Sequence, residues 1–185
     1  GNYRETNHLS ISVENSSYAV KEIINNDQLT LDGEIAKASI NYFRKLSDNL
    51  TLNVSLPIYS FSKGFLDNPI EQWHDLFGLS DGSRVDLPKS QLNFEVLSGS
   101  NKVKINDSDI GIGDIQISTK LNFYSKNKSD LYFITSLEIP TGSKKKYFGN
   151  DELDGLIALN LKNHLRDNLI INSVFGVSII NQSQN

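Results

Sequence analysis

The sequence lacks cysteine and methionine altogether and holds only 4 prolines in 185 residues. Without cysteine there is no disulfide and no thiolate metal site, so the fold has to hold without covalent cross-links. Because methionine is missing even at position 1, we expect a processed or excised product from which any secretory signal has already been removed.

Long apolar runs are also missing. The richest stretch, Leu169–Ile180, is interrupted by Asn172, Ser173 and Ser178, whereas a membrane helix needs ~18 apolar residues in a row. Any membrane contact is therefore expected to be made by strands. Apolar residues make up 38% of the chain and the mean hydropathy is −0.34. These values are low for a packed soluble core and suit a polar β protein, a partly disordered chain or a barrel with a wet interior.

Neither sign of charge dominates the chain. The formal net charge is −4, and the 18 Lys and Arg residues are scattered along the sequence. Nucleic-acid binding calls for a basic patch or stripe, so no nucleic-acid partner is expected.

Alternation of apolar and polar residues is the main pattern present. Every even-numbered residue in Leu50–Ile58 is apolar, and Ile115, Ile117, Leu121 and Phe123 alternate with polar residues in the next clear case. A period of two over nine or ten residues predicts a strand with one apolar and one wet face. Noisier versions of the pattern run through residues 8–19, 29–46, 91–97, 131–140, 155–165 and 169–180.

The connections between these segments are of two kinds. Ser47–Asn49, Lys126–Ser129 and Arg166–Asn168 are tight polar turns, whereas residues 61–90 (the long loop) and 141–151 are long. A further hairpin is expected over Gln91–Ile112, with its turn at residues 98–101. Short turns on one side and long loops on the other are typical of outer-membrane barrels.

We therefore predict an all-β fold, an antiparallel up-and-down transmembrane β-barrel in a bacterial, Gram-negative outer membrane. It forms a single domain over residues 1–185 or a fragment of one. Roughly nine strands, an odd number, together with a polar C-terminal tail predict part of a larger barrel. The long loop is expected to carry one short helix near Pro69–Phe77 that ends at Gly78.

The long loop is the most distinctive segment, because it holds the only Trp and most bulky apolar residues found outside strands. We expect it to plug the lumen or cover the mouth of the barrel, since a loop without function is more often polar. The candidate residues for this role are Phe65, Asp67, Glu71, Trp73, His74, Asp75 and Arg84. Arg84 is expected to pair with a loop carboxylate.

The same loop carries a resemblance. The run Gly64–Asp67, followed by Ile70, Glu71, Trp73, His74, Phe77–Leu79, Gly82 and Arg84, resembles the signature loop of a family of proteobacterial outer-membrane proteins. That family is catalogued as a domain of unknown function. Similar motifs of the family fall at Leu31–Glu34, Gly111–Asp114 and Leu137–Gly142. The resemblance spans about residues 29–142 and implies an outer-membrane location and a barrel. It implies no reaction, and because family members are longer, it agrees with a truncated chain.

Charged and amide side chains on the polar strand faces are expected to line the lumen, since charge on the lipid face is costly. These candidates are Asp32, Glu34, Asp114, Gln116, Lys120, Glu138 and Lys162. Their mixed signs favour an internal salt-bridge network over a selective filter. The same residues would equally fit a solvated face of a soluble sheet.

Lys144, Lys145 and Lys146 lie in the second long loop and are candidates for contact with lipopolysaccharide phosphates. The partners expected are thus outer-membrane lipid and lipopolysaccharide, together with a small solute or an envelope complex. The role expected is that of a passive, porin-like pore wall, a solute-binding protein or a structural envelope protein.

Two alternatives compete with this interpretation. A soluble periplasmic lipocalin-like barrel or β-sandwich that binds a ligand would share the alternation but turn its apolar faces inward. A metal-dependent hydrolase would use Glu71 and His74, which lie at i and i+3 on a helix, but a zinc site needs further ligands. The sequence shows no Gly-x-Ser-x-Gly elbow, so we expect no enzyme, no resident metal and no cofactor.

Overall fold

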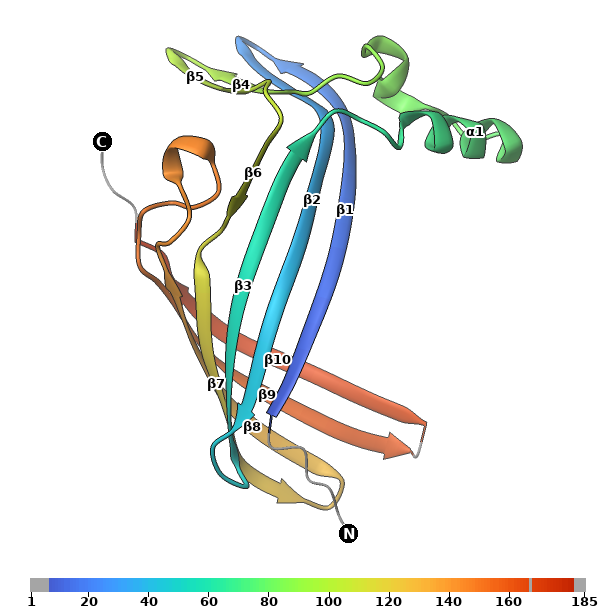
Figure 1. The fold of residues 1–185 in the computed structure, drawn as a ribbon. Helices are drawn as coiled ribbons and strands as arrows, with labels where there is room; N and C mark the ends of the chain where they lie inside the picture. The colour runs from blue at the N-terminus through green and yellow to red at the C-terminus, as the bar shows by residue number, and fades with distance from the viewer. Residues whose placement is uncertain (1–6, 167, 182–185) are drawn as a thin grey trace. The chain divides into compact units, whose positions relative to one another are not determined.

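The structure is a computed structural model that describes residues 7–166 and 168–181. It consists mainly of strands, with one α-helix and two short 3₁₀ helices in the described residues (Figure 1). The strands are β1 (Asn7–Ile24), β2 (Asp27–Lys45), β3 (Leu50–Ser62), β4 (Asn93–Ser98), β5 (Asn101–Ile105), β6 (Asp109–Ile112), β7 (Ile115–Lys126), β8 (Ser129–Ile139), β9 (Asp154–Arg166) and β10 (Leu169–Ile179). The helices are α1 (Asp67–Phe77), η1 (Gly82–Asp86) and η2 (Lys144–Lys146).

The strands join one antiparallel sheet in the order β10-β9-β8-β7-β3-β2-β4-β5, with β1 also paired to β2 and β6 to β3. The predicted all-β, antiparallel up-and-down class is thereby confirmed. The closed barrel is not formed, because β10 and β5 end the strand order and no described strand joins them. Alternation within a strand sets which side each residue faces, but closure depends on long-range pairing that the pattern does not encode.

The predicted turns and helix form where their residues require them. Asn127 and Lys128 both have positive φ, 52° and 66°, as the two central residues of a type I′ hairpin turn do. Helix α1 ends at Gly78, whose φ of 65° places it in the left-handed region suited to a helix terminus. The hairpin predicted around residues 98–101 is β4–β5. Of the predicted turn Arg166–Asn168, Asp167 lies outside the described residues.

The chain forms two compact units, and β1, β2 and β3 contribute residues to both. Of the described residues, the first unit holds 7–12, 39–57, 112–166 and 168–181, and the second unit holds 13–38 and 58–111. None of the helices in the described residues is long and apolar enough to cross a membrane.

The strands of the first unit place side chains of opposite character on their two faces. Paired residues on one face are Val54 and Ile117, Leu121 and Phe133, and Leu159 and Phe175. Paired residues on the other face include Gln116 and Glu138, and Tyr132 and Asn160. Directly paired residues point to the same side of a sheet, so the register builds one continuous apolar face and one polar face.

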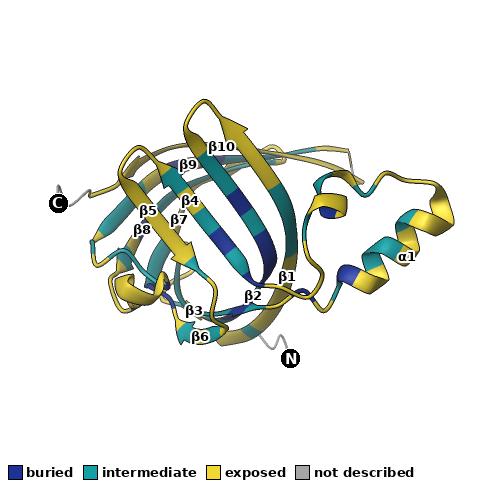
Figure 2. Cartoon of the chain, turned by 90° about the horizontal axis from the view of Figure 1, so that it is seen from above, coloured by how far each residue is buried: buried dark blue, intermediate teal, exposed yellow. Residues whose placement is uncertain are grey.

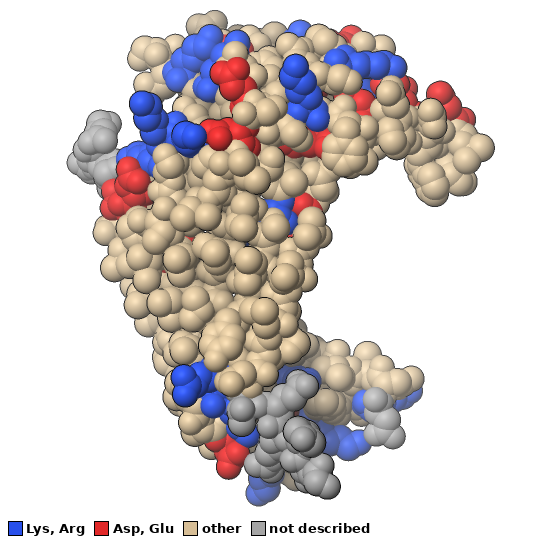
Figure 3. All heavy atoms as spheres, viewed as in Figure 1, with Lys and Arg blue, Asp and Glu red and all other residues tan. Residues whose placement is uncertain are grey.

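Little apolar surface is buried. Among the described residues the buried apolar side chains are only Pro57, Phe61, Leu92, Phe94, Phe148 and Ala158. By contrast, Leu137, Ile157 and Phe175 on the apolar face are 53%, 50% and 72% exposed. On the side of the molecule drawn in Figure 3, most charged residues gather toward the ends of the strands, and few lie on the surface between them. The sheet of the first unit therefore has no dry core on its apolar side.

The second unit packs a small aromatic cluster and carries the long loop. The ring of Phe94 lies edge-on to the rings of Tyr18 and Phe61, with centroids 5.8 and 6.2 Å away. Helix α1 is exposed or half-buried along most of its length (Figure 2). Because so little apolar surface holds the long loop, polar contacts have to fix its position.

Candidate functional site

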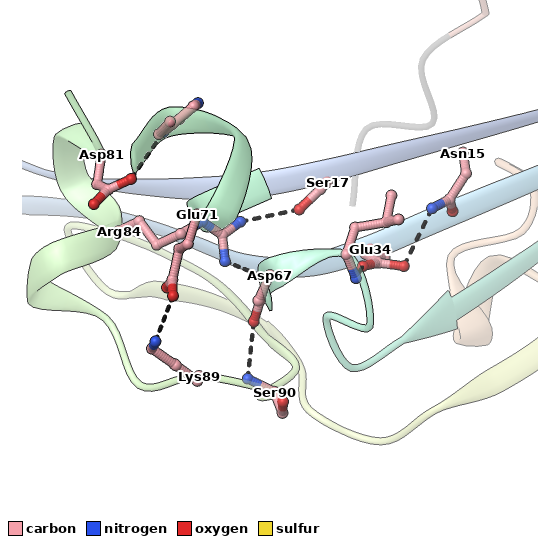
Figure 4. A network of polar contacts seen from close by, with 11 residues as sticks. Asn15, Ser17, Glu34, Asp67, Glu71, Asp81, Arg84, Lys89 and Ser90 are labelled. Carbon is pink, nitrogen blue, oxygen red and sulfur yellow. Dashed lines mark hydrogen bonds and ion pairs between the residues drawn. The ribbon is translucent and has the colours of Figure 1, made fainter. Parts of the chain in front are cut away.

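The long loop is tied to the sheet where it leaves β3. Glu34 of β2 is completely buried, and its Oε1 accepts a hydrogen bond of 2.6 Å from the backbone N–H of Leu66. Its Oε2 accepts a hydrogen bond of 3.1 Å from the side-chain amide of Asn15 in β1 (Figure 4). A buried carboxylate is tolerable only when its oxygens are bonded in this way.

A second anchor joins the start of α1 to the far side of the loop. Asp67, the first residue of α1, forms an ion pair with Arg84 of η1, and their side chains are only 3% and 8% exposed. Asp67 also accepts a hydrogen bond of 2.9 Å from the backbone N–H of Ser90, and Arg84 donates one of 3.0 Å to Ser17 of β1 (Figure 4). The pairing expected of Arg84 with a loop carboxylate is thus formed. We call Glu34, Asp67, Arg84 and these partners the loop anchor.

Two glycines make room for the loop anchor. Gly33 has a φ of 139°, and a Cβ there would lie 2.8 Å from a methyl carbon of Leu92. A Cβ on Gly64 would overlap the carboxylate of Asp67, whose carbon would be 2.6 Å away. The close approach of residues 62 and 91–92 therefore favours glycine at position 33, and the close approach of the Asp67 carboxylate within the loop favours glycine at position 64.

Asp32 adds a carboxyl group to the same region without the same bonding. Its side chain is 2% exposed, and its Oδ2 has no hydrogen-bond partner. Asn93 lies opposite in the β2–β4 register, and its Oδ1 also has none. Burial raises the pKa of the Asp32 carboxyl above its ordinary value; the nearby charge of Asp67 adds to this rise, and that of Arg84 opposes it. A proton on Asp32 would supply the donor that these two acceptors lack.

Helix α1 directs its polar side chains toward the rest of the loop. Glu71 pairs with Lys89, and His74 Nδ1 lies 2.8 Å from Asp81 Oδ1. Together with Asp67, these residues recur at i, i+4 and i+7 and share one face. The residues proposed for metal-dependent hydrolysis, Glu71 and His74, are both engaged in these pairs. Within the described residues, no group of three or more His, Asp and Glu is placed to hold a metal ion.

The apolar side chains of the long loop point the other way. Trp73, Leu76 and Phe77 are 59%, 75% and 57% exposed, and the rings of Trp73 and Phe77 lie 4.5 Å apart between centroids. Phe65, also a candidate, is exposed as well, as is Asp75. These residues contribute nothing to the loop anchor.

Four of the lumen-lining candidates share the polar face of the first unit. Gln116 lies opposite Glu138, Lys162 lies opposite Asp130, and the Lys120 ammonium sits 3.9 Å above the ring centre of Tyr132. Gln116 and Glu138 help to line a cavity of about 260 Å³. The face carries both signs of charge, and the internal salt-bridge network of these residues stays a prediction.

Asp114, another of the lumen-lining candidates, lies apart from the four residues just described. It is buried, and its carboxylate accepts hydrogen bonds of 2.7 Å from the Gly142 N–H and 3.2 Å from the Asn150 N–H. Thr141 Oγ donates a bond of 3.0 Å to the Gly113 carbonyl. The motifs Gly111–Asp114 and Leu137–Gly142 are therefore hydrogen-bonded to each other, and these bonds hold the loop after β8 in place.

The three lysines of that loop form the 3₁₀ helix η2, followed by Tyr147 with a φ of 62° and the buried Phe148. All three lysines are exposed. Their contact with lipopolysaccharide stays a prediction.

The structure regroups the residues singled out from the sequence. Asp32 and Glu34 were expected to line a lumen and Asp67 and Arg84 to belong to a plug, yet all four lie together. Sequence analysis missed their partners Asn15, Ser17, Ser90 and Asn93. Small polar residues in strands and loops carry no distinguishing signal, so only the register could have found them.

Comparison with known proteins places the chain in a family. No curated protein and no solved structure matches it. Residues 9–185, nearly the whole chain, match the family described as "Protein of unknown function (DUF3187)". The resemblance of the long loop to a family of unknown function thereby holds, and the chain belongs to that family.

Proposed function

We propose that the first unit is part of the wall of an outer-membrane β-barrel, with its apolar face toward lipid and its polar face toward the lumen. The observation that carries this proposal is the exposure of the apolar face, including Leu137, Ile157 and Phe175, in a sheet without a dry core. Apolar-out and polar-in alternation is the pattern of membrane barrels. The loop anchor and Asp32 lie in the second unit, outside these proposed membrane-crossing segments.

The soluble lipocalin-like alternative predicts the opposite burial. It would seal the apolar face inside, as in a sandwich or small barrel. Leu52, Val54, Ile115 and Ile117 are instead only half-buried, and none belongs to the small buried apolar set. This observation favours the membrane proposal over the soluble one.

A sheet that crosses a membrane needs a partner strand at each of its edges. Backbone N–H and C=O groups cannot stay unpaired in hydrocarbon, so a sheet that crosses a bilayer has to close. The outer edge of β10 has no partner among the described strands. The proposed barrel therefore requires further strands at its edges. Its role would be passive, as a pore wall, a solute-binding wall or a structural envelope component.

Adjacent residues of β10 provide the test. Phe175 lies on the apolar face opposite Leu159, Val174 lies on the other face opposite Asn160, and they are 72% and 62% exposed. If lipid covers the apolar face, Phe175→Lys should lower the unfolding free energy in phosphatidylcholine vesicles by ~2–4 kcal/mol, whereas Val174→Lys should cost little. Urea titration of vesicle-folded protein measures both.

If water covers both faces, the two substitutions have the same small effect. That result, or a wild-type protein that stays monomeric and folded without detergent, would refute the proposal.

A further inference from the structure

The long loop is inverted relative to a loop on a water-soluble protein. Beyond the end of β3 at Ser62, its buried side chains are the charged residues Asp67 and Arg84. Six of its large apolar side chains, by contrast, are exposed by more than half, whereas Leu66, Ile70 and Leu87 are half-buried. The six are Phe65, Trp73, Leu76, Phe77, Leu79 and Val85. A surface helix normally does the reverse and turns its apolar stripe inward.

The loop anchor holds this inverted orientation. Asp67, Glu71 and His74 share one face of α1 and are engaged with Arg84, Lys89 and Asp81 of the same loop. Trp73, Leu76 and Phe77 have i, i+3 and i+4 spacing and share another face. Rotation of α1 to bury the aromatic face would break the buried ion pair of Asp67 with Arg84.

We propose that the face of α1 formed by Trp73, Leu76 and Phe77 lies in the headgroup region of a lipid bilayer and makes α1 an interfacial anchor. The inference rests on the proposed membrane location of the sheet. Amphipathic helices of this kind lie in the plane of the interface with their apolar face ~5–10 Å deep.

The chemistry of the face favours lipid over a protein partner. Trp is enriched at membrane interfaces because its ring is apolar while its N–H can bond to headgroups and water. Trp73, Leu76 and Phe77 carry no charge, and the acids Asp67 and Glu71 are already paired with cations of the same loop. The sheet of the first unit also exposes its apolar side chains. Contact with lipid would therefore account for the exposed apolar residues of the sheet and of α1.

The single Trp of the chain makes the inference directly measurable. Protein that has Trp73 as its only tryptophan is folded into phosphatidylcholine vesicles, and Trp73 emission is recorded with brominated lipids whose bromines sit at shallow or deep acyl positions. We expect a blue-shifted emission and quenching that is stronger from the shallow position. A second protein, Trp73→Phe with Phe175→Trp, reports in the same way on the apolar face of the sheet.

The two reporters separate the two proposals. If Trp at position 175 is quenched by brominated lipid while Trp73 stays red-shifted and open to aqueous acrylamide, the interfacial anchor is refuted and the membrane sheet stands. If neither is quenched, both proposals fail. If Trp73 shifts to the blue without any quenching by brominated lipid, a protein surface covers it and the lipid inference is overturned.

A matched pair of substitutions in α1 completes the test. Leu76→Asn replaces an apolar side chain that is 75% exposed, and Asp75→Asn changes an exposed neighbour outside the aromatic face. Leu76→Asn should reduce the quenching of Trp73 by brominated lipid severalfold, whereas Asp75→Asn should leave it unchanged. Equal quenching in both variants would contradict a lipid-facing role for this side.

Discussion

Removal of Arg84 is the sharpest test of the loop anchor. The substitution Arg84→Met keeps a long side chain but leaves Asp67 buried with only the Ser90 N–H as a described donor. Breaking a buried ion pair by removing one partner costs ~3–5 kcal/mol, because the remaining charge stays uncompensated. Since ~1.4 kcal/mol is a factor of ten in an equilibrium constant, the open form of the loop should gain on the order of a hundredfold or more.

Hydrogen exchange measures this opening under native conditions. Peptides that contain Leu66 and Ser90 report on it, because their N–H groups bond to Glu34 and Asp67 when the loop is closed. Where reclosing is fast, the exchange rate follows the open population. We expect these peptides to exchange on the order of a hundredfold faster in Arg84→Met, with the strands of the first unit unchanged.

Lys89→Met is the matched control. It removes the partner of Glu71 in the same loop, but the Lys89 side chain is 60% exposed, so water replaces the lost contact. Exchange should therefore change little. Adding Asp67→Asn to Arg84→Met should recover much of the protection, because the stranded charge is gone. If Arg84→Met and Lys89→Met behave alike, the buried pair does not hold the loop.

Two further predictions concern Asp32 and Gly142. Because burial raises the pKa of Asp32 above its unfolded-state value, the folded protein binds more protons and loses stability as pH rises through the raised pKa. Asp32→Asn should abolish that loss of stability, which thermal unfolding between pH 4 and pH 8 measures. A variant with the same pH profile as the wild type would contradict the raised pKa of Asp32. A Cβ at Gly142 would overlap the Phe148 carbonyl, whereas one at Gly155 would meet nothing closer than 3.8 Å. Gly142→Ala should therefore cost ~1–3 kcal/mol of unfolding free energy in urea titrations and Gly155→Ala almost none. Equal costs would show that the backbone around Gly142 shifts readily despite its hydrogen bond to Asp114.

Local patterns in the sequence determined the elements. Alternation located the strands, and turn-forming residues such as Asn127 placed the hairpins. Pro69 lies in the first turn of the only α-helix in the described residues, and Gly78 follows its last residue. These features depend on residues that are neighbours in the chain, so the sequence alone is enough to predict them. The motif in the long loop carried the resemblance to the family, and the family match over residues 9–185 confirms the membership.

Contacts between distant residues were decided only by tertiary structure. Asp32 and Glu34 belong to a strand and Asp67 and Arg84 to a loop, and nothing in the spacing indicated that they meet under the long loop. Asp114 shows the same limit, because a polar position in a strand pattern does not reveal the backbone of Gly142 above it. Alternation fixes the side of the sheet that a residue faces. Strand register and loop placement fix which residues it contacts on that side, and both depend on pairing between segments far apart in the chain.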